Sequence, residues 1–276
     1  MKRITTKTLA VVASAILIAG MISGCAESEE VKEAKSACSA EIERLEGQEV
    51  ELDAAIADGE ELIAAGENLL EPELIPALET AVSEGKAAKI EIPSIPSKIE
   101  DIEATTNELK AVSYVEERTG IENTAEAVRR SIRQYDLVDQ PTEAYVIERL
   151  GEVDGVQDIS AVTEEHDPNG NLNKAGGYTA AVYFSSPLVD LSKLPGAGSS
   201  IIDRGTDGGG CVEVYSTAED AQKREEYLAV FDGGALASGS HAVVGTTLVR
   251  TSDKLTASQQ EALEKAIIDS LVFIEE

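Results

Sequence analysis

The stretch CVEVYSTAEDAQKREEYLAVF, residues 211–231, places a strand pattern directly before a helix pattern. Its two leading valines share one face and Cys211 lies on the other, which is the alternation of a β-strand. Ser216 and Glu219 then have the spacing of a capping box, which marks the start of a helix. The apolar positions of that helix are Ala221, Leu228 and Phe231. A strand followed at once by an amphipathic helix predicts a domain that contains both kinds of element.

The sequence before this stretch adds one helix and two strands. Thr142 is placed to cap a short helix that ends near Leu150. Residues 159–163 and 178–184 alternate apolar side chains along the chain, so both are predicted strands. The segment HDPNG, residues 166–170, is rich in turn-forming residues and reverses the chain between them.

The sequence after it adds one more strand and one more helix. HAVVGTTLV, residues 241–249, is predicted as one continuous strand, and Thr256 with Gln259 forms a capping box for an amphipathic helix. The order is then helix, three strands, helix, strand, helix. For residues 141–276 this order predicts an α+β fold, a two-layer α/β sandwich with a mixed four-stranded sheet and helices on one face.

Residues 25–140 have a different pattern and are predicted to form a helical bundle or stalk. Residues at seven-residue spacing, and others four residues beyond them, form one apolar stripe. They are Val31, Cys38, Leu45 and Leu52, with Ile42, Ile56 and Ile63. Lys35 and Glu49 interrupt the stripe, and Gly47 weakens the helix locally. The stripe therefore favours one face of a bundle over a long autonomous coiled coil.

Part of this helical region resembles the FIVAR-type three-helix modules of bacterial surface proteins. The resemblance rests on LDAAIADGEELI, residues 52–63, followed by ELIPALETAVSEGKAA, residues 73–88, and covers about residues 50–115. It implies a spacer or adhesive module. A generic helical stalk is the alternative, because such stripes report burial first of all.

The C-terminal region resembles uncharacterised lipoproteins of high-GC Gram-positive bacteria. Some of these carry names transferred from the extracellular matrix-binding protein Ebh. The resemblance rests on DPNGNLNKAGGYTAAVYF, residues 167–184, VEVYSTAEDAQKREEYL, residues 212–228, and VVGTTLVRTSDKLTASQQEALEKAI, residues 243–267. It covers about residues 141–276 and implies a fold and a location, without an established activity.

The N-terminus has the layout of an export signal. A basic start precedes an apolar run from Leu9 to Ile22, which is too short for a comfortable transmembrane helix. The run ends in MISGC, residues 21–25, which resembles the lipobox of bacterial lipoproteins. The resemblance implies a signal peptide over residues 1–24, diacylglycerol on the thiol of Cys25, and a lipid anchor at the extracytoplasmic face of the membrane. An ordinary cleaved signal with a coincidental cysteine is the alternative.

The charge of the chain restricts its partners. Removing residues 1–24 takes away three basic residues and leaves 20 Lys and Arg against 52 Asp and Glu, a formal charge of −32. Such a charge repels phosphate backbones, so nucleic acid is not expected as a partner. Divalent cations or basic polymers fit better. The chain has no tryptophan, which argues against a carbohydrate platform of stacked indoles.

Two cysteines remain once Cys25 is lipidated. Cys38 and Cys211 then lie in an oxidising compartment, where one intramolecular disulfide is allowed. The sequence alone does not show that these distant residues come within bridging distance.

Four alternating residues in the segment DPNGNLNK resemble the first oxygen ligands of a calcium loop: Asp167, Asn169, Asn171 and Asn173. The loop lacks the glycine expected at its sixth position, which is Leu172, and the bidentate glutamate expected at its twelfth, which is Tyr178. The competing interpretation is a type I hairpin turn over 167–170, because Asp, Pro and Gly occupy its favoured positions.

The sequence contains no familiar catalytic constellation. His241 follows Ser240, but no G-x-S-x-G elbow is present, and adjacent strand residues point to opposite faces. We therefore expect a non-enzymatic lipoprotein, a binding or adhesion and spacer module that engages an envelope protein or a wall polymer. The alternatives are an extracytoplasmic hydrolase that uses unrecognised carboxylates and a solute-binding lipoprotein.

Overall fold

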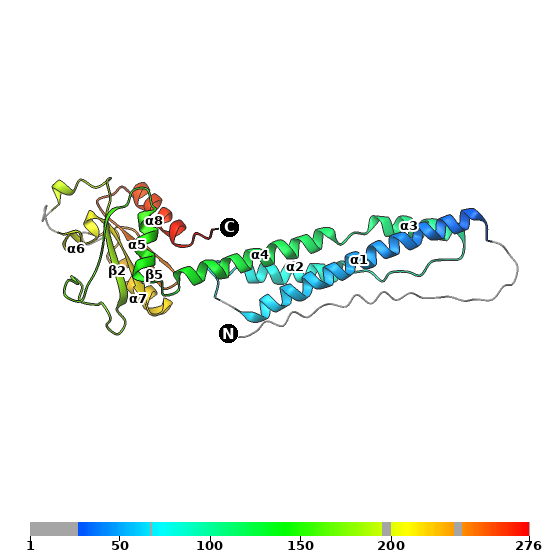
Figure 1. Cartoon of the computed structure of the whole chain (residues 1–276), viewed down its shortest axis with the longest axis horizontal. Helices are drawn as coiled ribbons and strands as arrows, with labels where there is room; N and C mark the ends of the chain where they lie inside the picture. Colours follow the sequence, from blue (N-terminus) through cyan, green and yellow to red (C-terminus); the bar gives the residue numbers. More distant parts are fainter. Residues whose placement is uncertain (1–26, 67, 195–199, 235–238, 276) are drawn as a thin grey trace. The chain divides into compact units, whose positions relative to one another are not determined.

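The computed structural model describes residues 27–275 except 67, 195–199 and 235–238 (Figure 1). The predicted signal peptide, residues 1–24, and the predicted lipidation site Cys25 lie outside the described residues. Among the described residues, no helix combines the length and the apolar character needed to cross a membrane. The fold class is α+β with an N-terminal helical region, as predicted.

The chain forms two compact units, and one helix contributes to both. Helix α1, Glu29–Ala65, continues across the division at Glu46. The first unit takes the residues up to Glu46 together with Glu91–Val112, and the second takes Gly47–Ile90 together with Ser113–Glu276. The secondary structure changes elsewhere, near residue 140, since the helices before it are long and strands begin after it.

The first unit is built from the beginning of α1 and from α3, Ile99–Ala111. Its buried apolar side chains are Cys38, Leu45, Ile102 and Leu109. The guanidinium of Arg44 donates hydrogen bonds to the carbonyl oxygens of Leu109 and Val112, at 2.8 and 3.0 Å. The end of a helix leaves carbonyl groups without intrahelical partners; here the carbonyl of Leu109 also accepts from the amide of Val112.

Before residue 140, the helices of the second unit are the rest of α1, α2, Leu74–Ala88, and α4, Val115–Val138. Their core continues the predicted stripe and consists of Leu52, Ile56, Leu78, Val82, Ile121, Ala125 and Val128. Close packing uses glycine: a Cβ on Gly85 meets the Cδ1 of Ile121 at 2.8 Å. Helix α4 continues without a break through Gly120.

The sheet has five strands and not the predicted four. They are β1, Gln157–Ala161, β2, Tyr178–Ser185, β3, Gly209–Tyr215, β4, His241–Val244, and β5, Thr247–Thr251. Their order is β1-β2-β3-β5-β4, and every neighbouring pair is antiparallel, so the prediction of a mixed sheet was wrong.

The extra strand comes from a turn inside HAVVGTTLV. Val244 pairs with Thr247 across a two-residue loop, and Gly245, the first residue of that loop, has a φ of 58°. Glycine at this position is what a type II′ hairpin turn requires. The segment therefore forms a hairpin, and its two strands lie side by side at one edge of the sheet.

Helices cover both faces of the sheet, which corrects the prediction of two layers with helices on one face. Helices α5, Glu143–Gly151, and α8, Ala257–Leu271, pack on one face, whose core includes Val182, Val212 and Val249. The other face carries α7, Ala218–Ala229, and α6, Ile201–Arg204. Two short 3₁₀ helices, Leu191–Lys193 and Gly205–Gly208, flank α6.

A β-bulge decides which face one tyrosine joins. The pairing of β2 with β3 shifts between Tyr178 and Ala180, so Tyr178 lies in the α7-side core while Ala180 lies in the α8-side core. A strict alternation, as the sequence suggests, would put both on one face. The bulge therefore adds a large aromatic side chain to the α7 side.

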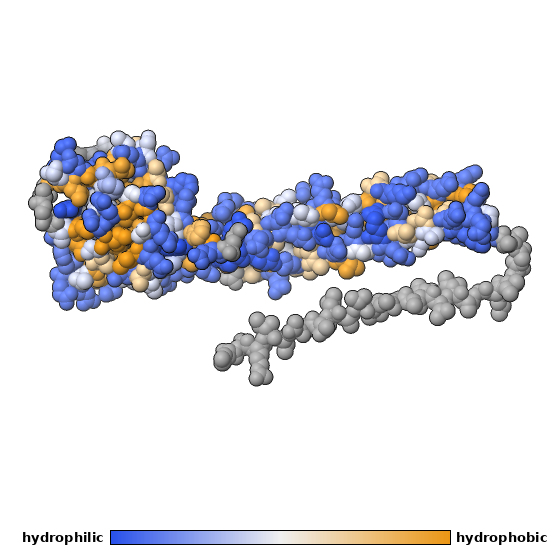
Figure 2. Space-filling view, turned by 45° about the horizontal axis from the view of Figure 1, so that its top comes forward, coloured by the Kyte–Doolittle hydropathy of each residue, from blue (hydrophilic) through white to orange (hydrophobic). Residues whose placement is uncertain are grey.

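The capping residues are mostly those expected. Thr142 accepts a hydrogen bond from the amide of Tyr145, and Thr256 with Gln259 forms the predicted capping box. Helix α7 is capped by Thr217, which accepts from the amide of Asp220, and not by Ser216. The surface over α1 to α4 is mostly hydrophilic, whereas apolar side chains gather over the sheet-containing part (Figure 2).

Candidate functional site

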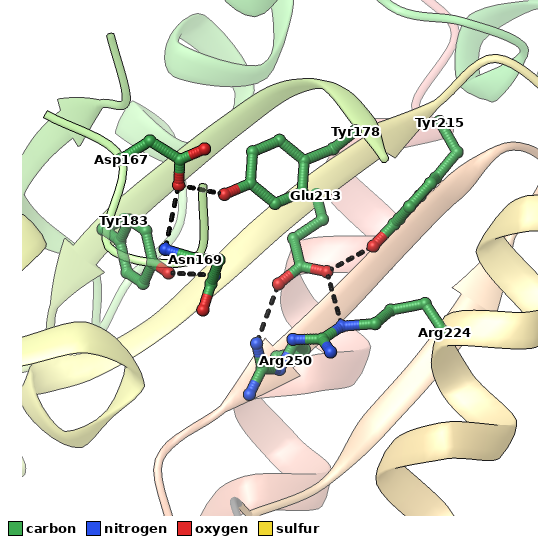
Figure 3. Close-up of polar contacts among 8 residues, drawn as sticks. All are labelled: Asp167, Asn169, Tyr178, Tyr183, Glu213, Tyr215, Arg224 and Arg250. Atoms are coloured by element: carbon green, nitrogen blue, oxygen red, sulfur yellow. Dashed lines mark hydrogen bonds and ion pairs between the residues drawn. The ribbon is translucent and has the colours of Figure 1, made fainter. Parts of the chain in front are cut away.

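A buried ionic cluster lies between β3, β5 and α7 (Figure 3). The Oε1 atom of Glu213 accepts a hydrogen bond from Nη1 of Arg250 at 2.8 Å. Its Oε2 atom accepts from the hydroxyl of Tyr215 at 2.7 Å and from Nε of Arg224 at 3.4 Å. The Glu213 side chain has an exposed fraction of 0%. Both carboxylate oxygens are therefore occupied by partners within the protein.

The sheet register explains why these groups meet. Cys211 lies opposite Arg250, and Glu213 lies opposite Leu248, so Arg250 and Glu213 are diagonal neighbours on one face. Diagonal positions on neighbouring strands lie within reach of long side chains. Arg224 reaches the same carboxylate from α7 above the sheet. Burial of a carboxylate needs such charged partners, since an unpaired buried charge is strongly unfavourable.

A second polar group joins the loop before β2 to the same sheet face. The hydroxyl of Tyr178 donates to Oδ1 of Asp167, and Nδ2 of Asn169 donates to the hydroxyl of Tyr183 at 3.2 Å (Figure 3). The rings of Tyr178 and Tyr215 meet edge to face with centroids 6.4 Å apart. The tyrosines thus connect the loop with the ionic cluster.

Hydrogen bonds from the loop's own backbone complete the surroundings of Asp167. Its carboxylate accepts from the amide of Asn169 at 3.0 Å and from the amide of Leu172 at 2.8 Å. Burial alone raises the pKa of Asp167, but the bonds from Tyr178 and from the backbone amides outweigh it and leave this pKa below its usual value. The amide of Gly170 donates to the carbonyl of Asp167 at 3.1 Å, which closes the predicted turn.

The other two residues of the calcium hypothesis lie apart from the sheet face. Asn171 is exposed, and Asn173 has a φ of 59° with its side chain donating to Glu164 at 3.2 Å. Within the part of the chain that the structure describes, no three acidic, histidine or cysteine side chains are grouped as metal ligands. The proposed calcium site at Asp167, Asn169, Asn171 and Asn173 stays a prediction.

Burial changes the acid–base behaviour of four groups on this face. Burial raises the pKa of Tyr178, Tyr183 and Tyr215 above the usual tyrosine value, and for Tyr215 the nearby charge of Glu213 adds to the effect. Burial raises the pKa of the Cys211 thiol in the same way. These groups therefore keep their protons at neutral pH, and the thiol is not activated as a nucleophile.

The structure gives Cys38 and Cys211 as free thiols, so it does not contain the disulfide that the cysteine count allowed. Each has an exposed fraction of 0%. Cys38 lies in the core of the first unit, and Cys211 lies in the α7-side core of the second. A bridge between them requires that both cores open.

An acidic cavity of about 640 Å³ lies at the edge of the sheet where β4 begins. It is lined by residues from both sides of the sheet, namely Glu225, Asp232, Gly233, Gly239, Ser240, His241, Asp253, Gln260 and Glu264. His241 lies between two carboxylates, with Nδ1 3.2 Å from Glu225 and Nε2 3.2 Å from Asp232. The Oε2 atom of Glu264 is buried and has no hydrogen-bond partner among the described residues.

Sequence reasoning did not identify the buried ionic cluster. A signal was present in CVEVY, because the alternation that puts Cys211 on one face puts Glu213 and Tyr215 on the same face. A carboxylate at an inward strand position needs a cationic partner, and Arg250 ends the next apolar segment. The position of Arg224 on α7 adds the second cation. The acidic cavity has no comparable signal, since its carboxylates come from separate segments.

Comparison of the chain with protein-family models, with curated proteins and with solved structures finds no match.

Proposed function

We propose that this protein is a lipid-anchored extracytoplasmic lipoprotein whose α+β domain is a non-enzymatic binding module. The stretch MISGC, residues 21–25, which resembles a lipobox, supports the anchor. The expected partner is an envelope protein or a wall polymer, and nucleic acid is not expected because of the acidic charge. The resemblances to high-GC Gram-positive lipoproteins and to FIVAR-type modules agree with such a role.

The observation that carries the binding proposal is the closed state of the ionic cluster. Glu213 has both oxygens occupied and no exposed surface, so it cannot take a proton from a substrate or give one to it. The same holds for the buried tyrosines and the Cys211 thiol, which keep their protons. These groups connect the sheet with α7 through buried contacts, and elements held in this way suit a binding surface.

The hydrolase alternative has one specific observation in its favour. The cavity at β4 contains Glu225, Asp232, Asp253 and Glu264, and pairs of carboxylates serve as general acid and base in many hydrolases. The solute-binding alternative lacks such support, because the described sheet is single and a solute usually lies between two lobes.

Site-specific photo-crosslinking in intact cells tests the proposal. The full chain carries a photoreactive residue at Tyr227, an exposed position of α7, and in a matched strain at Val50, an exposed position of α1. We expect a defined crosslinked species from the position on the α+β domain and none from α1. The same products from both positions, or none from either, would contradict a binding role for the α+β domain.

An assay for turnover separates the binding module from the hydrolase. Purified full-length protein is incubated with isolated envelope, and the variants Glu225→Gln and Glu264→Gln are compared with it. Release of small fragments that both variants abolish would favour the hydrolase. If all three proteins release no more fragments than buffer alone, the result agrees with the binding module.

A further inference from the structure

The two edges of the sheet differ in how well they accept another strand. At the β1 edge, the pairing with β2 is irregular between Gln157 and Ser160, and Asp158 has a φ of 47°. A bulge and a left-handed residue disturb the regular row of backbone groups, which is a common protection of edges. The β4 edge, His241–Val244, pairs with β5 without interruption.

The hydrogen-bond pattern shows which backbone groups of β4 face outward. The amide of Thr251 donates to the carbonyl of Ser240 at 2.9 Å, and bonded pairs alternate along an antiparallel ladder. Ala242 and Val244 therefore bond to β5, while the N–H and C=O groups of His241 and Val243 point away from it. No backbone group among the described residues bonds to them. They form a short free row for another strand.

The acidic cavity lies beside the first residues of this edge. Its lining includes His241, the first residue of β4, and Ser240 just before it. Glu225 from α7 lines it on one face of the sheet, and Glu264 from α8 lines it on the other. A segment that pairs with β4 passes this cavity, because Ser240 and His241 at the start of β4 are part of its lining.

The charges in the cavity favour a cation. Four carboxylates line it. Among the described residues, the basic side chains that pair with them are His241, with Glu225 and Asp232, and Lys254, with Asp253 at 2.8 Å. The His241 side chain has an exposed fraction of 6%, and its buried Nδ1 makes no hydrogen bond. The buried Oε2 of Glu264 also has none, so it can accept a bond from an incoming donor.

We propose that the β4 edge and this cavity together bind an extended segment of a partner protein that carries a lysine or arginine. The segment adds to the sheet as an antiparallel strand next to β4, using the outward groups of His241 and Val243. Its basic side chain enters the cavity and pairs with Glu264. Main-chain bonds of this kind give affinity and a side-chain pocket gives specificity. This inference rests on the proposed binding function and locates it.

Peptide binding to the full chain tests the proposal. The probe is a fluorescent nine-residue peptide of threonine and valine with one central arginine, and the matched peptide has glutamate in place of arginine. Fluorescence anisotropy gives the dissociation constants. We expect the arginine peptide to bind up to about fivefold tighter, since one favourable charge pair at a partly exposed site is worth up to about that factor. Equal constants for the two peptides would overturn the proposal.

Two variants separate the edge from the cavity. Glu264→Gln should reduce the preference for arginine, whereas Glu261→Gln, at an exposed position of the same helix outside the cavity, should leave it unchanged. Val243→Pro should abolish binding of both peptides because it removes an outward N–H, and Val243→Ile, which keeps that N–H, should not. Undiminished binding by a folded Val243→Pro protein would contradict the edge.

A measurement on the unaltered protein covers the case in which Val243→Pro does not fold. Two versions of the arginine peptide are made, one N-methylated at the odd-numbered residues and one at the even-numbered residues. Strand addition predicts that one register loses binding and the other keeps it, since only alternate amides face the protein. Equal affinity in both registers overturns strand addition. If the peptides fail but the crosslink at Tyr227 persists, the binding module stands and this site does not.

Discussion

Arg250 and Glu213 lie diagonally across the neighbouring strands β5 and β3, with Nη1 and Oε1 2.8 Å apart and exposed fractions of 8% and 0%. In the register of these strands the two residues are not directly opposite each other. The guanidinium reaches along the sheet past Cys211, its direct partner in register. The pair joins two central strands of the sheet, and α7 adds Arg224 as a second cation on the same carboxylate.

Removing one member of this pair should destabilise the second unit strongly. Glu213→Gln leaves the buried guanidinium of Arg250 and the partly buried one of Arg224 without a matching charge, so we expect a loss of about 3–5 kcal/mol in the free energy of unfolding. Urea unfolding of the full chain, followed by circular dichroism, measures it. Lys265→Gln, which breaks an exposed pair with Asp269, is the control and should change stability by less than about 1 kcal/mol. Similar effects of the two substitutions would contradict a structural role for the cluster.

Alkaline pH should unfold the protein through its buried tyrosines. Burial raises the pKa values of Tyr178, Tyr183, Tyr215 and Cys211, so the folded state holds protons that the unfolded state loses above about pH 9 to 10. Stability from these groups is fully present below the unfolded-state values and falls as the pH rises above them. Each group contributes a slope of about 1.4 kcal/mol per pH unit.

Unfolding free energies measured across the alkaline range check this slope. Tyr215→Phe removes one of the four groups and should make the slope shallower, whereas Tyr227→Phe, at a side chain that is 56% exposed, serves as the control. Stability that does not change up to pH 11 would show that these groups do not titrate differently in the two states.

The stability that the loop at Asp167 contributes should depend on the carboxylate charge of this residue. Asp167→Asn retains one acceptor oxygen but turns the other into a donor, which then faces either the amide of Leu172 at Oδ2 or the amide of Asn169 at Oδ1. We expect a loss of about 1–3 kcal/mol at neutral pH. Because the folded-state pKa of Asp167 is lowered, its contribution is present above the usual value and is lost as the pH falls, so the difference between variant and wild type should vanish in acid.

Thermal unfolding of both proteins at neutral and acidic pH measures this difference. A difference that persists unchanged in acid would show that the carboxylate charge is not the cause. The calcium hypothesis for the same loop predicts a higher melting temperature in millimolar calcium than in chelator. Calcium must then displace the hydrogen bonds that Asp167 already accepts, and equal temperatures would end the hypothesis.

Two glycines should respond to alanine in opposite directions. Gly245 has a φ of 58°, and a Cβ there meets the carbonyl oxygen of Val138 at 2.6 Å, so Gly245→Ala should destabilise by about 1–3 kcal/mol. Gly47 lies inside α1, where a Cβ meets nothing within 4 Å, so Gly47→Ala should stabilise the helix by about 1 kcal/mol. Melting temperatures of the full chain compare them, and a stabilising Gly245→Ala would contradict the hairpin turn.

The proposed lipid anchor should depend on the thiol of Cys25. Cys25→Ser removes the thiol that the lipobox chemistry modifies, so we expect loss of labelling by radioactive palmitate and release of the protein from the membrane fraction. Cys38→Ser is the matched control, since its thiol is buried in the first unit. Labelling that survives Cys25→Ser would contradict the anchor.

Local patterns predicted the elements well and their assembly less well. The stripe through Cys38, Leu45 and Leu52 is buried as expected, because helical periodicity reports directly on burial. The sheet was predicted with one strand too few, since Gly245 and Thr246 form a turn inside an unbroken apolar pattern. The prediction also missed the second helical layer. Capping and periodicity locate α7 along the chain, but they do not specify which face of the sheet it covers.

The candidate sites show the same limit. The cluster at Glu213 joins side chains from β3, β5 and α7, and the acidic cavity joins residues from Glu225 to Glu264, so both depend on tertiary contacts. The turn at Asp167 was predictable because its hydrogen bonds lie within a few residues. Separation along the chain, more than residue type, decided what the sequence could show.

Helix α8 ends close to the C-terminus, and Leu263, Ile267 and Leu271 belong to the same core as Val146 and Leu150 near the beginning of the sandwich. The α8-side core therefore remains open until α8 has been synthesised. A premature stop within the final roughly twenty codons removes one wall of that core. Each missing core side chain lowers the free energy of unfolding by roughly 1.5–3 kcal/mol, because its burial is lost. Such a truncated chain should be degraded by proteases although it keeps all five strands.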